Sequence, residues 1–370
     1  MNRALRAAAA VLPPLLVFGA VRWLFALAAA AVGLDASHPG SWVRWDARHY
    51  MSIATTGYEY FPCPPRFGRP WEACGNAAWF PLYPWVMRPW IALGAAPATA
   101  GLWVAGLGAL GMLIALWNAF LRRSGLRGWL VLGMAGVFPG AVYQHAIFPT
   151  SLALLCLVLA GFFVARRRWA LAGVAGAGVA LSYVTGVLVS GPNAAAAWLR
   201  TRTLRPAFIA GGFAAAGLGL VLGLHQLLLG HWDAFYRVYR KGLPAMARPV
   251  DAFLGVVGPA FDAASDPRAR TAAAQALTVA GLVLLGLGTA VVMRRRPSPV
   301  RSWAALSTLL FWAFPLAVGR GVSLYRSDAL VLPVLLLLIE LPAWALAPLL
   351  VWLALLAQAM GRLFFTGYLV

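Results

Sequence analysis

Long apolar segments alternate with short polar segments along almost the whole chain, from about residue 11 to about residue 360. A membrane-spanning helix needs about 20 mostly apolar residues, and fewer where other helices enclose it. With charges, prolines and glycines taken as breaks, the pattern predicts an all-α integral membrane protein with about eleven spanning helices. They cover residues 11–33, 98–120, 129–146, 150–165, 169–182, 184–199, 206–229, 272–293, 302–319, 328–340 and 342–360.

Two polar segments are much longer than the rest, residues 34–89 and 230–271. Several predicted helices are short, which favours helices enclosed in a bundle over helices that face lipid. The first apolar segment is too long for the apolar part of a signal peptide, so we expect it to be retained. We therefore treat residues 1–370 as a single multi-spanning domain.

Composition supports this class, because 62% of the residues are hydrophobic and only 11% are charged. Soluble domains have about 45–50% apolar and about 25% charged residues, and the mean hydropathy here is +0.78. The net charge of +20 does not indicate nucleic-acid binding, because the basic residues form short clusters between apolar segments.

The basic clusters predict an orientation. All of them fall on one side of the predicted threading, in short segments without Asp or Glu, which marks that side as cytoplasmic. The clusters are Arg3 and Arg6; Arg122, Arg123 and Arg127; Arg166 to Arg168; Arg200, Arg202 and Arg205; and Arg294 to Arg296 with Arg301. The N-terminus is then cytoplasmic, and both long polar segments and the C-terminus are external. Arginine replaces lysine except at Lys241, which is typical of a GC-rich bacterial genome and predicts a bacterial plasma membrane.

The three cysteines are too few for a disulfide framework or a cysteine-based metal site. Cys156 lies in an apolar segment, where it acts as a small hydrophobic residue. Cys63 and Cys74 share one polar segment, and a bridge between them would contribute about 3 kcal/mol. Both the paired and the free state are open at this point.

Charge gathers in one external stretch, RWDARHYMSIATTGYEY at residues 44–60. A helix or turn would place Asp46 and His49 on one face, where they could share a proton or bind one substrate hydroxyl. The alternative is that Asp46 caps a helix that runs through the stretch. Further along, AWFPLYPWVMRPW at residues 78–90 has the composition of a segment lying at the membrane surface.

These motifs resemble a known family. RWDARHYMSIATTGY followed by WFPLYP is similar to the first external loop of the PIG-V mannosyltransferases, multi-spanning enzymes of the GT-C glycosyltransferase fold that include bacterial relatives of GPI mannosyltransferase II. FPGAVYQHAIFPTSL at 138–152, YVTG at 183–186 and SLYRSDALVLP at 323–333 resemble later segments of the family. The likeness covers most of the chain and is densest in the first loop.

The resemblance implies transfer of mannose, or a similar hexose, from a polyprenyl-phosphate sugar to a hydroxyl of a lipid, glycan or protein acceptor on the external face. Asp46 matches the position of the base that takes the acceptor proton. Arg326 is the candidate for the departing phosphate, because a guanidinium binds phosphate oxygens bidentately.

Other candidates would position sugar or phosphate around these two. They are Arg44, Trp45, Arg48, His49 and Tyr58, with Glu59, Tyr183, Arg240 and Arg320 as further possibilities. For Arg240 and Arg320 the alternative is ordinary snorkelling at the membrane surface. We expect no cofactor and metal-independent transfer, or at most a weak requirement for a divalent ion, because Asp46 and Glu59 make a thin ligand set.

The chain departs from the family pattern at two positions. Bacterial members commonly have Glu where this chain has Thr150, and Arg where it has Tyr183. We expect both positions at external helix ends close together, so that a neutral pair replaces an ion pair.

Two other classes of function stay open beside the enzyme. The departures favour a non-catalytic binder of lipid-linked sugars, a flippase or an assembly subunit on the same scaffold, whereas the intact residues around Asp46 favour the enzyme. A secondary transporter would show inverted repeats and polar groups at mid-membrane, and the chain has no evident repeat.

Overall fold

The computed structural model describes residues 3–63, 73–239, 248–295, 298–318 and 324–369. This part of the chain is helical apart from the short antiparallel strands β1 (Tyr60–Phe61) and β2 (Cys74–Gly75). The α-helices are α1 (Arg3–Ala30), α2 (Ala47–Thr55), α3 (Leu82–Ala92), α4 (Pro97–Leu116), α5 (Gly125–Gly136), α6 (Ala141–His145), α7 (Thr150–Ala165), α8 (Trp169–Ala180), α9 (Ser190–Thr201), α10 (Leu204–Leu229), α11 (Ala234–Tyr239), α12 (Pro249–Val257), α13 (Pro267–Val292), α14 (Pro299–Ala317), α15 (Leu324–Ser327), α16 (Leu335–Leu338) and α17 (Ala343–Phe365). The 3-10 and π segments are η1 (Pro39–Trp42), η3 (Trp117–Leu121), η4 (Val184–Val189), η6 (Gly258–Ala260), η7 (Met293–Arg295) and η8 (Asp328–Val334).

Six helical segments within the described ranges are long and apolar enough to cross a membrane. They are Ala8–Ala30, Pro97–Leu121, Leu204–Leu229, Pro267–Val292, Pro299–Ala317 and Ala343–Phe365. Each coincides with one of the predicted spans. The all-α class is confirmed, and these six helices support a multi-pass membrane protein.

The other five predicted spans are short or divided. Residues 150–165 and 169–182 form α7 and α8, of 16 and 12 residues. Residues 184–199 divide into η4 and α9, residues 129–146 into α5 and α6, and residues 328–340 into η8 and α16. Hydropathy alone does not distinguish such buried, interrupted segments from regular spans.

The interruption between α5 and α6 has a steric cause. Gly140 has φ +80°, a conformation that favours glycine. A Cβ at this position would lie 2.9 Å from the carbonyl oxygen of Tyr325, so only glycine fits. The irregular η8 contains Pro333 and is buried along its whole length, and irregular backbone at membrane depth is tolerated where protein encloses it.

Small residues let two helices approach closely in one half of the bundle. A Cβ at Gly176 in α8 would lie 2.7 Å from the Ala214 Cβ in α10, and a Cβ at Gly217 would lie 2.6 Å from the Ala177 carbonyl oxygen. Close approach at small residues is a usual way to associate helices where lipid removes the hydrophobic driving force.

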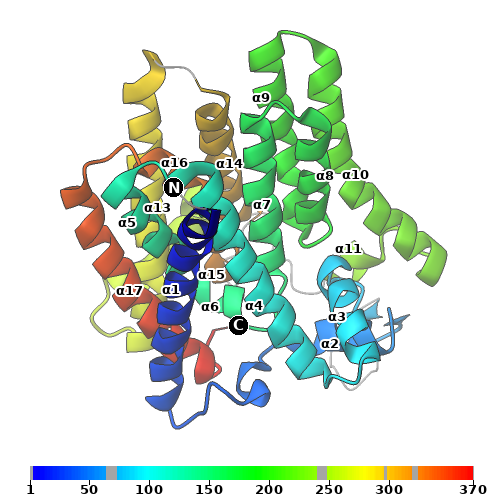
Figure 1. The fold of residues 1–370 in the computed structure, drawn as a ribbon. Coiled ribbons are helices and arrows are strands. Elements are labelled where there is room, and N and C mark those ends of the chain that lie inside the picture. Colours follow the sequence, from blue (N-terminus) through cyan, green and yellow to red (C-terminus); the bar gives the residue numbers. More distant parts are fainter. Residues whose placement is uncertain (1–2, 64–72, 240–247, 296–297, 319–323, 370) are drawn as a thin grey trace.

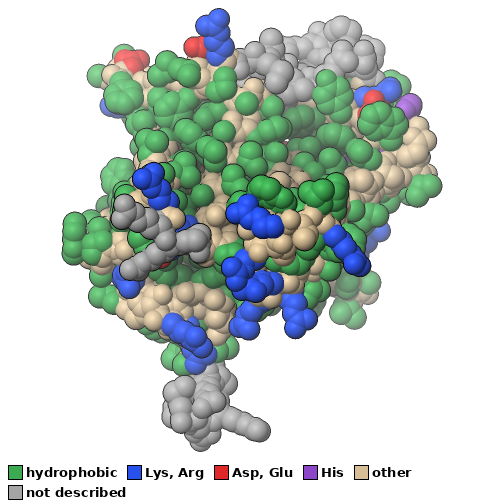
Figure 2. Space-filling model, turned by 90° about the horizontal axis from the view of Figure 1, so that it is seen from above, with side chains coloured by type: hydrophobic (Ala, Val, Ile, Leu, Met, Phe, Trp, Pro, Cys, Tyr) green, Lys and Arg blue, Asp and Glu red, His purple; other side chains and the backbone are tan. Residues whose placement is uncertain are grey.

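The two ends of the bundle differ (Figure 1). The α9–α10 connection, the end of α13 and the start of α14 lie at its upper end, and α2, α3, the strands and the C-terminus lie toward the lower end. Figure 2 looks onto the upper face and shows many Lys and Arg side chains with few Asp or Glu among them. The polar stretch after α1 therefore meets the end of α17 at the lower end, where the candidate site is found.

Candidate active site

Asp46 and Arg326 form an ion pair that joins segments 280 residues apart in the chain. Nη1 of Arg326 donates a hydrogen bond to Oδ2 of Asp46. The side chains of Asp46 and Arg326 are 23% and 19% exposed, so the pair is partly buried. The candidates for base and phosphate ligand therefore lie in direct contact.

Asp46 occupies the N-cap position of α2, but its carboxylate makes no capping hydrogen bond. Asp46 therefore stands where a capping residue would stand, but its side chain does not cap the helix. The preceding residue, Trp45, has φ +47°, a left-handed conformation that is uncommon for a residue other than glycine. This turn brings the chain into α2 with the Asp46 carboxylate directed at Arg326.

The segment that carries Arg326 is held by a buried amide. Nε2 of Gln275 in α13 donates to Oδ2 of Asp328 at 2.7 Å and to the Tyr325 carbonyl at 3.3 Å. Gln275 is 1% exposed and Asp328 is 2% exposed. These bonds hold the Tyr325 carbonyl and the Asp328 side chain, which lie on either side of Arg326 in the chain.

The guanidinium of Arg326 is strongly held in its charged form. Its Cζ lies 5.7 Å from the centre of the Phe148 ring, in the range of a cation–π contact. Burial lowers the pKa of Arg326, but the adjacent Asp46 carboxylate more than offsets this, so that the pKa lies above its usual value. Arg326 is thus a permanent positive charge at this position.

The two positions that depart from the family pattern meet beside the ion pair. Oγ1 of Thr150 and the hydroxyl of Tyr183 are hydrogen-bonded at 2.7 Å. Thr150 is fully buried, and burial raises the pKa of Tyr183 to about 12 although the bond to Thr150 opposes this. The expectation that these positions lie close together is confirmed, and the pair they form is neutral.

Tyr50 was absent from the candidates drawn from the sequence. It lies one helical turn after Asp46 on α2 and is 3% exposed. Burial raises the pKa of its hydroxyl well above the usual value; Tyr183 and Asp46 add to this, and Arg326 opposes it. The spacing of four residues from Asp46 was a signal that the two share a helix face.

Tyr143 and Phe148 were also missed, although both lie in the 138–152 segment. The Tyr143 ring centre is 5.1 Å from that of Phe148, which in turn lies 6.2 Å from Tyr50. The Tyr143 hydroxyl is buried and has no hydrogen-bond partner among the described residues. The ion pair therefore lies next to a cluster of three aromatic rings, Tyr50, Tyr143 and Phe148, in which the Tyr143 hydroxyl has no described partner.

His49 and Tyr58 lie against Trp79. The His49 ring stacks on Trp79 with centres 3.5 Å apart and planes 14° apart. The Tyr58 hydroxyl donates to the Trp79 carbonyl at 2.9 Å, and its ring lies 5.0 Å from that of His225. His49 and Tyr58 thus join α2 and the residues after it to the aromatic segment of the loop.

Glu59 lies at the start of a small hairpin. Its backbone N–H donates to Oδ1 of Asn76 at 2.8 Å, and its side chain is exposed. The hairpin is closed by a disulfide between Cys63 and Cys74, which decides the question of pairing that the sequence left open.

Two candidates cannot be placed, because Arg240 and Arg320 lie outside the described residues. Within the described ranges no three His, Cys, Asp or Glu side chains gather as a metal site. The partner of Asp46 is a cation and not a second carboxylate. Metal-independent transfer stays a prediction.

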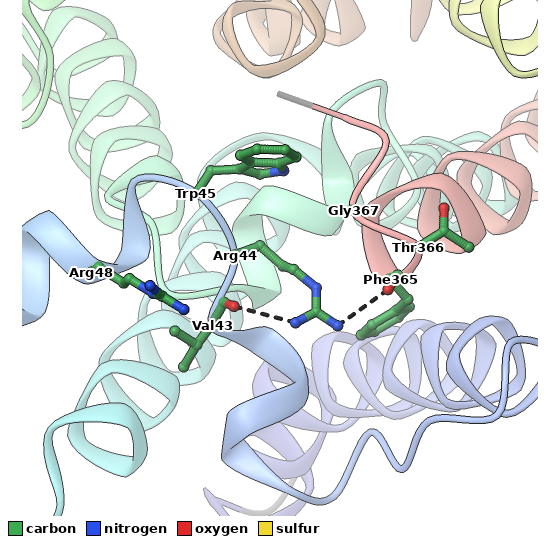
Figure 3. A pocket seen from close by; sticks show the side chains of 7 residues that line it. All are labelled: Val43, Arg44, Trp45, Arg48, Phe365, Thr366 and Gly367. Atoms are coloured by element: carbon green, nitrogen blue, oxygen red, sulfur yellow. Dashed lines mark hydrogen bonds between the residues drawn. The ribbon is translucent and has the colours of Figure 1, made fainter. Parts of the chain in front are cut away.

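A groove of about 520 Å³ lies at the segment that leads into α2, next to the position of Asp46 in the sequence (Figure 3). Its lining comes from the approach to α2 and from the end of α17. The residues are Val43, Arg44, Trp45, Arg48, Phe365, Thr366 and Gly367. Three of the sequence candidates, Arg44, Trp45 and Arg48, are therefore brought together here.

The chain matches no protein-family model and no curated protein sequence. The site geometry alone describes a carboxylate and a guanidinium in contact and hydroxyls around them, with a positively charged groove lined by the residues that precede and follow Asp46 in the chain. This arrangement suits a reaction that needs a proton acceptor and a fixed positive charge a few ångströms apart.

Proposed function

We propose that this protein is a membrane glycosyltransferase that moves mannose, or a similar hexose, from a polyprenyl-phosphate sugar to an acceptor hydroxyl. The observation that carries the proposal is the Asp46–Arg326 ion pair at the mouth of the bundle. Both side chains are partly exposed, 23% for Asp46 and 19% for Arg326, so a substrate can reach the carboxylate and the guanidinium from the surface.

The ion pair also orders the events of catalysis. A donor phosphate competes with Asp46 for the guanidinium of Arg326, since arginine binds phosphate oxygens at least as well as a carboxylate. Arrival of the donor therefore frees the Asp46 carboxylate. The base becomes available only when a donor is bound.

The transfer step then follows. The acceptor oxygen forms a bond to C1 of the sugar while the bond from C1 to the phosphate oxygen breaks. The acceptor proton passes to Asp46, and the bonding electron pair leaves with the phosphate, where Arg326 stabilises its charge. Atoms and charge balance without a metal or other co-reactant.

The neutral Thr150–Tyr183 pair bears on substrate choice. Two hydroxyls replace the Glu and Arg that the resemblance leads one to expect, and they keep one hydrogen bond between the same positions. Because both charges are absent together, neither is left buried and unpaired. We propose that this pair retunes sugar recognition and leaves the Asp46 chemistry in place.

The proposal extends to the fold and its orientation. We propose a GT-C-type bundle in a bacterial plasma membrane, with the arginine-rich end cytoplasmic and the end that carries Asp46 external. The lipid tail of the donor would lie along the helices, and its phosphate would reach Arg326 at the surface.

The experiment measures sugar transfer in membranes that contain the protein, with radiolabelled polyprenyl-phosphate mannose and the host lipid extract. Wild type, Asp46→Asn and a matched control, Asp262→Asn on the exposed second loop, are compared together. We expect a labelled product with wild type and the control, and none with Asp46→Asn.

Saturable donor binding without transfer by any of the three proteins would contradict the enzyme and favour the second candidate, a non-catalytic binder of lipid-linked sugars. The replaced charges at Thr150 and Tyr183 are the observation in its favour. Donor binding by wild type and by Asp46→Asn alike would then follow.

A further inference from the structure

We infer that the groove beside Trp45 binds the anionic headgroup of a glycolipid acceptor, with the acceptor's phosphodiester held by Arg44 and Arg48. That the bound lipid is an acceptor rests on the proposed function. Binding of an anionic headgroup in the groove does not depend on that function.

Charge in the groove is one-sided. Two of its seven lining residues are arginines, and none is acidic. Nη1 and Nη2 of Arg44 donate to the carbonyls of Val43 and Phe365 at 3.3 and 3.1 Å, and its buried Nε has no partner within the described part of the chain. All the partners of Arg44 that the structure describes are neutral, so its charge is available to an anion.

Arg48 is the more accessible of the two. Its side chain is exposed and lies in the first turn of the nine-residue helix α2. The N-terminal end of a helix carries partial positive charge, which adds to that of Arg48. Arg44 is partly engaged at the C-terminal end of α17, so we assign the stronger role in anion binding to Arg48.

Trp45 supplies an apolar surface next to these charges. Its side chain is 41% exposed although its backbone has the uncommon φ of +47°. Anchoring at the membrane surface explains an exposed tryptophan, but it does not require a strained backbone. A flat ring and two guanidiniums that line one groove fit a headgroup in which a sugar ring and a phosphate lie some distance apart.

The position of the groove favours the acceptor over the donor. Arg326, the candidate for the donor phosphate, is not among its lining residues, whereas Trp45 immediately precedes Asp46 in the chain. A headgroup held on Trp45 and Arg48 would therefore present its hydroxyls beside the base, while the donor approaches from the Arg326 side.

The test reads the groove directly and needs no turnover. The protein in phosphatidylcholine nanodiscs is labelled with 5-fluorotryptophan, and the Trp45 fluorine line is assigned by its loss in Trp45→Phe. It is titrated with dihexanoyl phosphatidylglycerol, with the neutral octyl mannoside and with inorganic phosphate. Each titration is repeated on Arg48→Gln, Arg48→Lys and Arg200→Gln, a basic residue outside the groove.

We expect a saturable shift of the Trp45 line with the anionic lipid and none with the neutral glycoside. Loss of a charge-assisted hydrogen bond should weaken binding at least tenfold in Arg48→Gln and less in Arg48→Lys, with no change in Arg200→Gln. Equal response to octyl mannoside would overturn the role of charge. Equally tight binding of inorganic phosphate would overturn the lipid headgroup as the ligand.

The two proposals fail separately. Sugar transfer without any response of the Trp45 line would refute the groove and leave the glycosyltransferase standing. A saturable response that depends on Arg48, in a protein without transfer activity, would establish the anionic-lipid site and refute the enzyme.

Discussion

Two parts of the first polar loop, close together in sequence, are organised in different ways. The residues around Asp46 are held by partners far along the chain, Arg326 and the end of α17. The hairpin that begins at Glu59 is held by its own neighbours. Its disulfide joins residues only 11 positions apart, and Asn76 bonds back to it.

This difference indicates that the residues around Asp46 serve the reaction and that the hairpin serves the local structure of the loop. A charge with a distant partner couples the site to the whole bundle, whereas a loop closed on itself can keep its form without that support. We expect changes near Asp46 to alter activity and changes in the hairpin to alter mainly local stability. The following predictions sharpen this comparison, from the largest expected effect on transfer to the smallest.

The two carboxylates of the loop should differ most. Asp46→Asn should lower transfer about a thousandfold, as loss of a general base does, whereas Glu59→Gln should change it less than twofold because Glu59 is exposed at the hairpin. Initial rates with saturating donor measure both. Similar losses in the two variants would remove the distinction between the two parts of the loop.

Arg326→Gln should lower transfer about a hundredfold, because the departing phosphate loses its fixed positive charge. It should also destabilise the protein by about 2 kcal/mol, less than a fully buried pair, since both side chains are partly exposed. The check on this is a double-mutant cycle of thermal unfolding with Asp46→Asn.

In that cycle the double variant should be more stable than the sum of the single losses predicts. Additive losses would mean that the ion pair contributes nothing to stability, and that the long-range hold on Asp46 comes from elsewhere.

Replacing the neutral pair Thr150 and Tyr183 by Glu and Arg tests whether a charged pair can take the same place. Thr150→Glu alone should destabilise the protein by about 3 kcal/mol, because it buries a carboxylate at a fully buried position. Adding Tyr183→Arg should recover most of that loss, and transfer should stay within about tenfold of wild type. Melting temperatures of the three proteins measure the recovery; no recovery would refute the idea of an exchanged pair.

The hairpin should show the smallest effect on transfer. Cys74→Ser should cost about 2–3 kcal/mol of stability through loss of a short closed loop, yet change transfer at low temperature less than twofold. Reductant should cause the same loss of stability in wild type. The control Cys156→Ser, which keeps the disulfide, should not show this loss without reductant. A large loss of transfer at low temperature would show that the hairpin supports the site after all.

Several features were predictable from the sequence because they depend on local properties. Helices of spanning length follow from runs of apolar residues, and all six coincide with predicted segments. The proximity of Thr150 and Tyr183 was predicted because the threading places both positions at external helix ends. The resemblance placed Asp46 and Arg326 in separate motifs and did not predict their direct contact.

Other features could not be predicted, because they depend on neighbours that sequence spacing does not reveal. The stacking of the His49 ring on Trp79 joins α2 to a later part of the loop, and no spacing within α2 reveals it. The free hydroxyl of Tyr143 becomes notable only when its surroundings are known.

The sequence by itself determined that the chain is an apolar helical protein, and where its charges are collected. Composition and apolar periodicity are sums over local residues, so they need no tertiary contact. Only the tertiary structure decided which charges meet. It turns the chain at Trp45, holds Tyr325 and Asp328 on either side of Arg326 through hydrogen bonds from Gln275, and brings the end of α17 to Arg44. Such contacts follow from how distant segments are packed in three dimensions, because a guanidinium can reach any carboxylate or carbonyl that the fold places within a few ångströms.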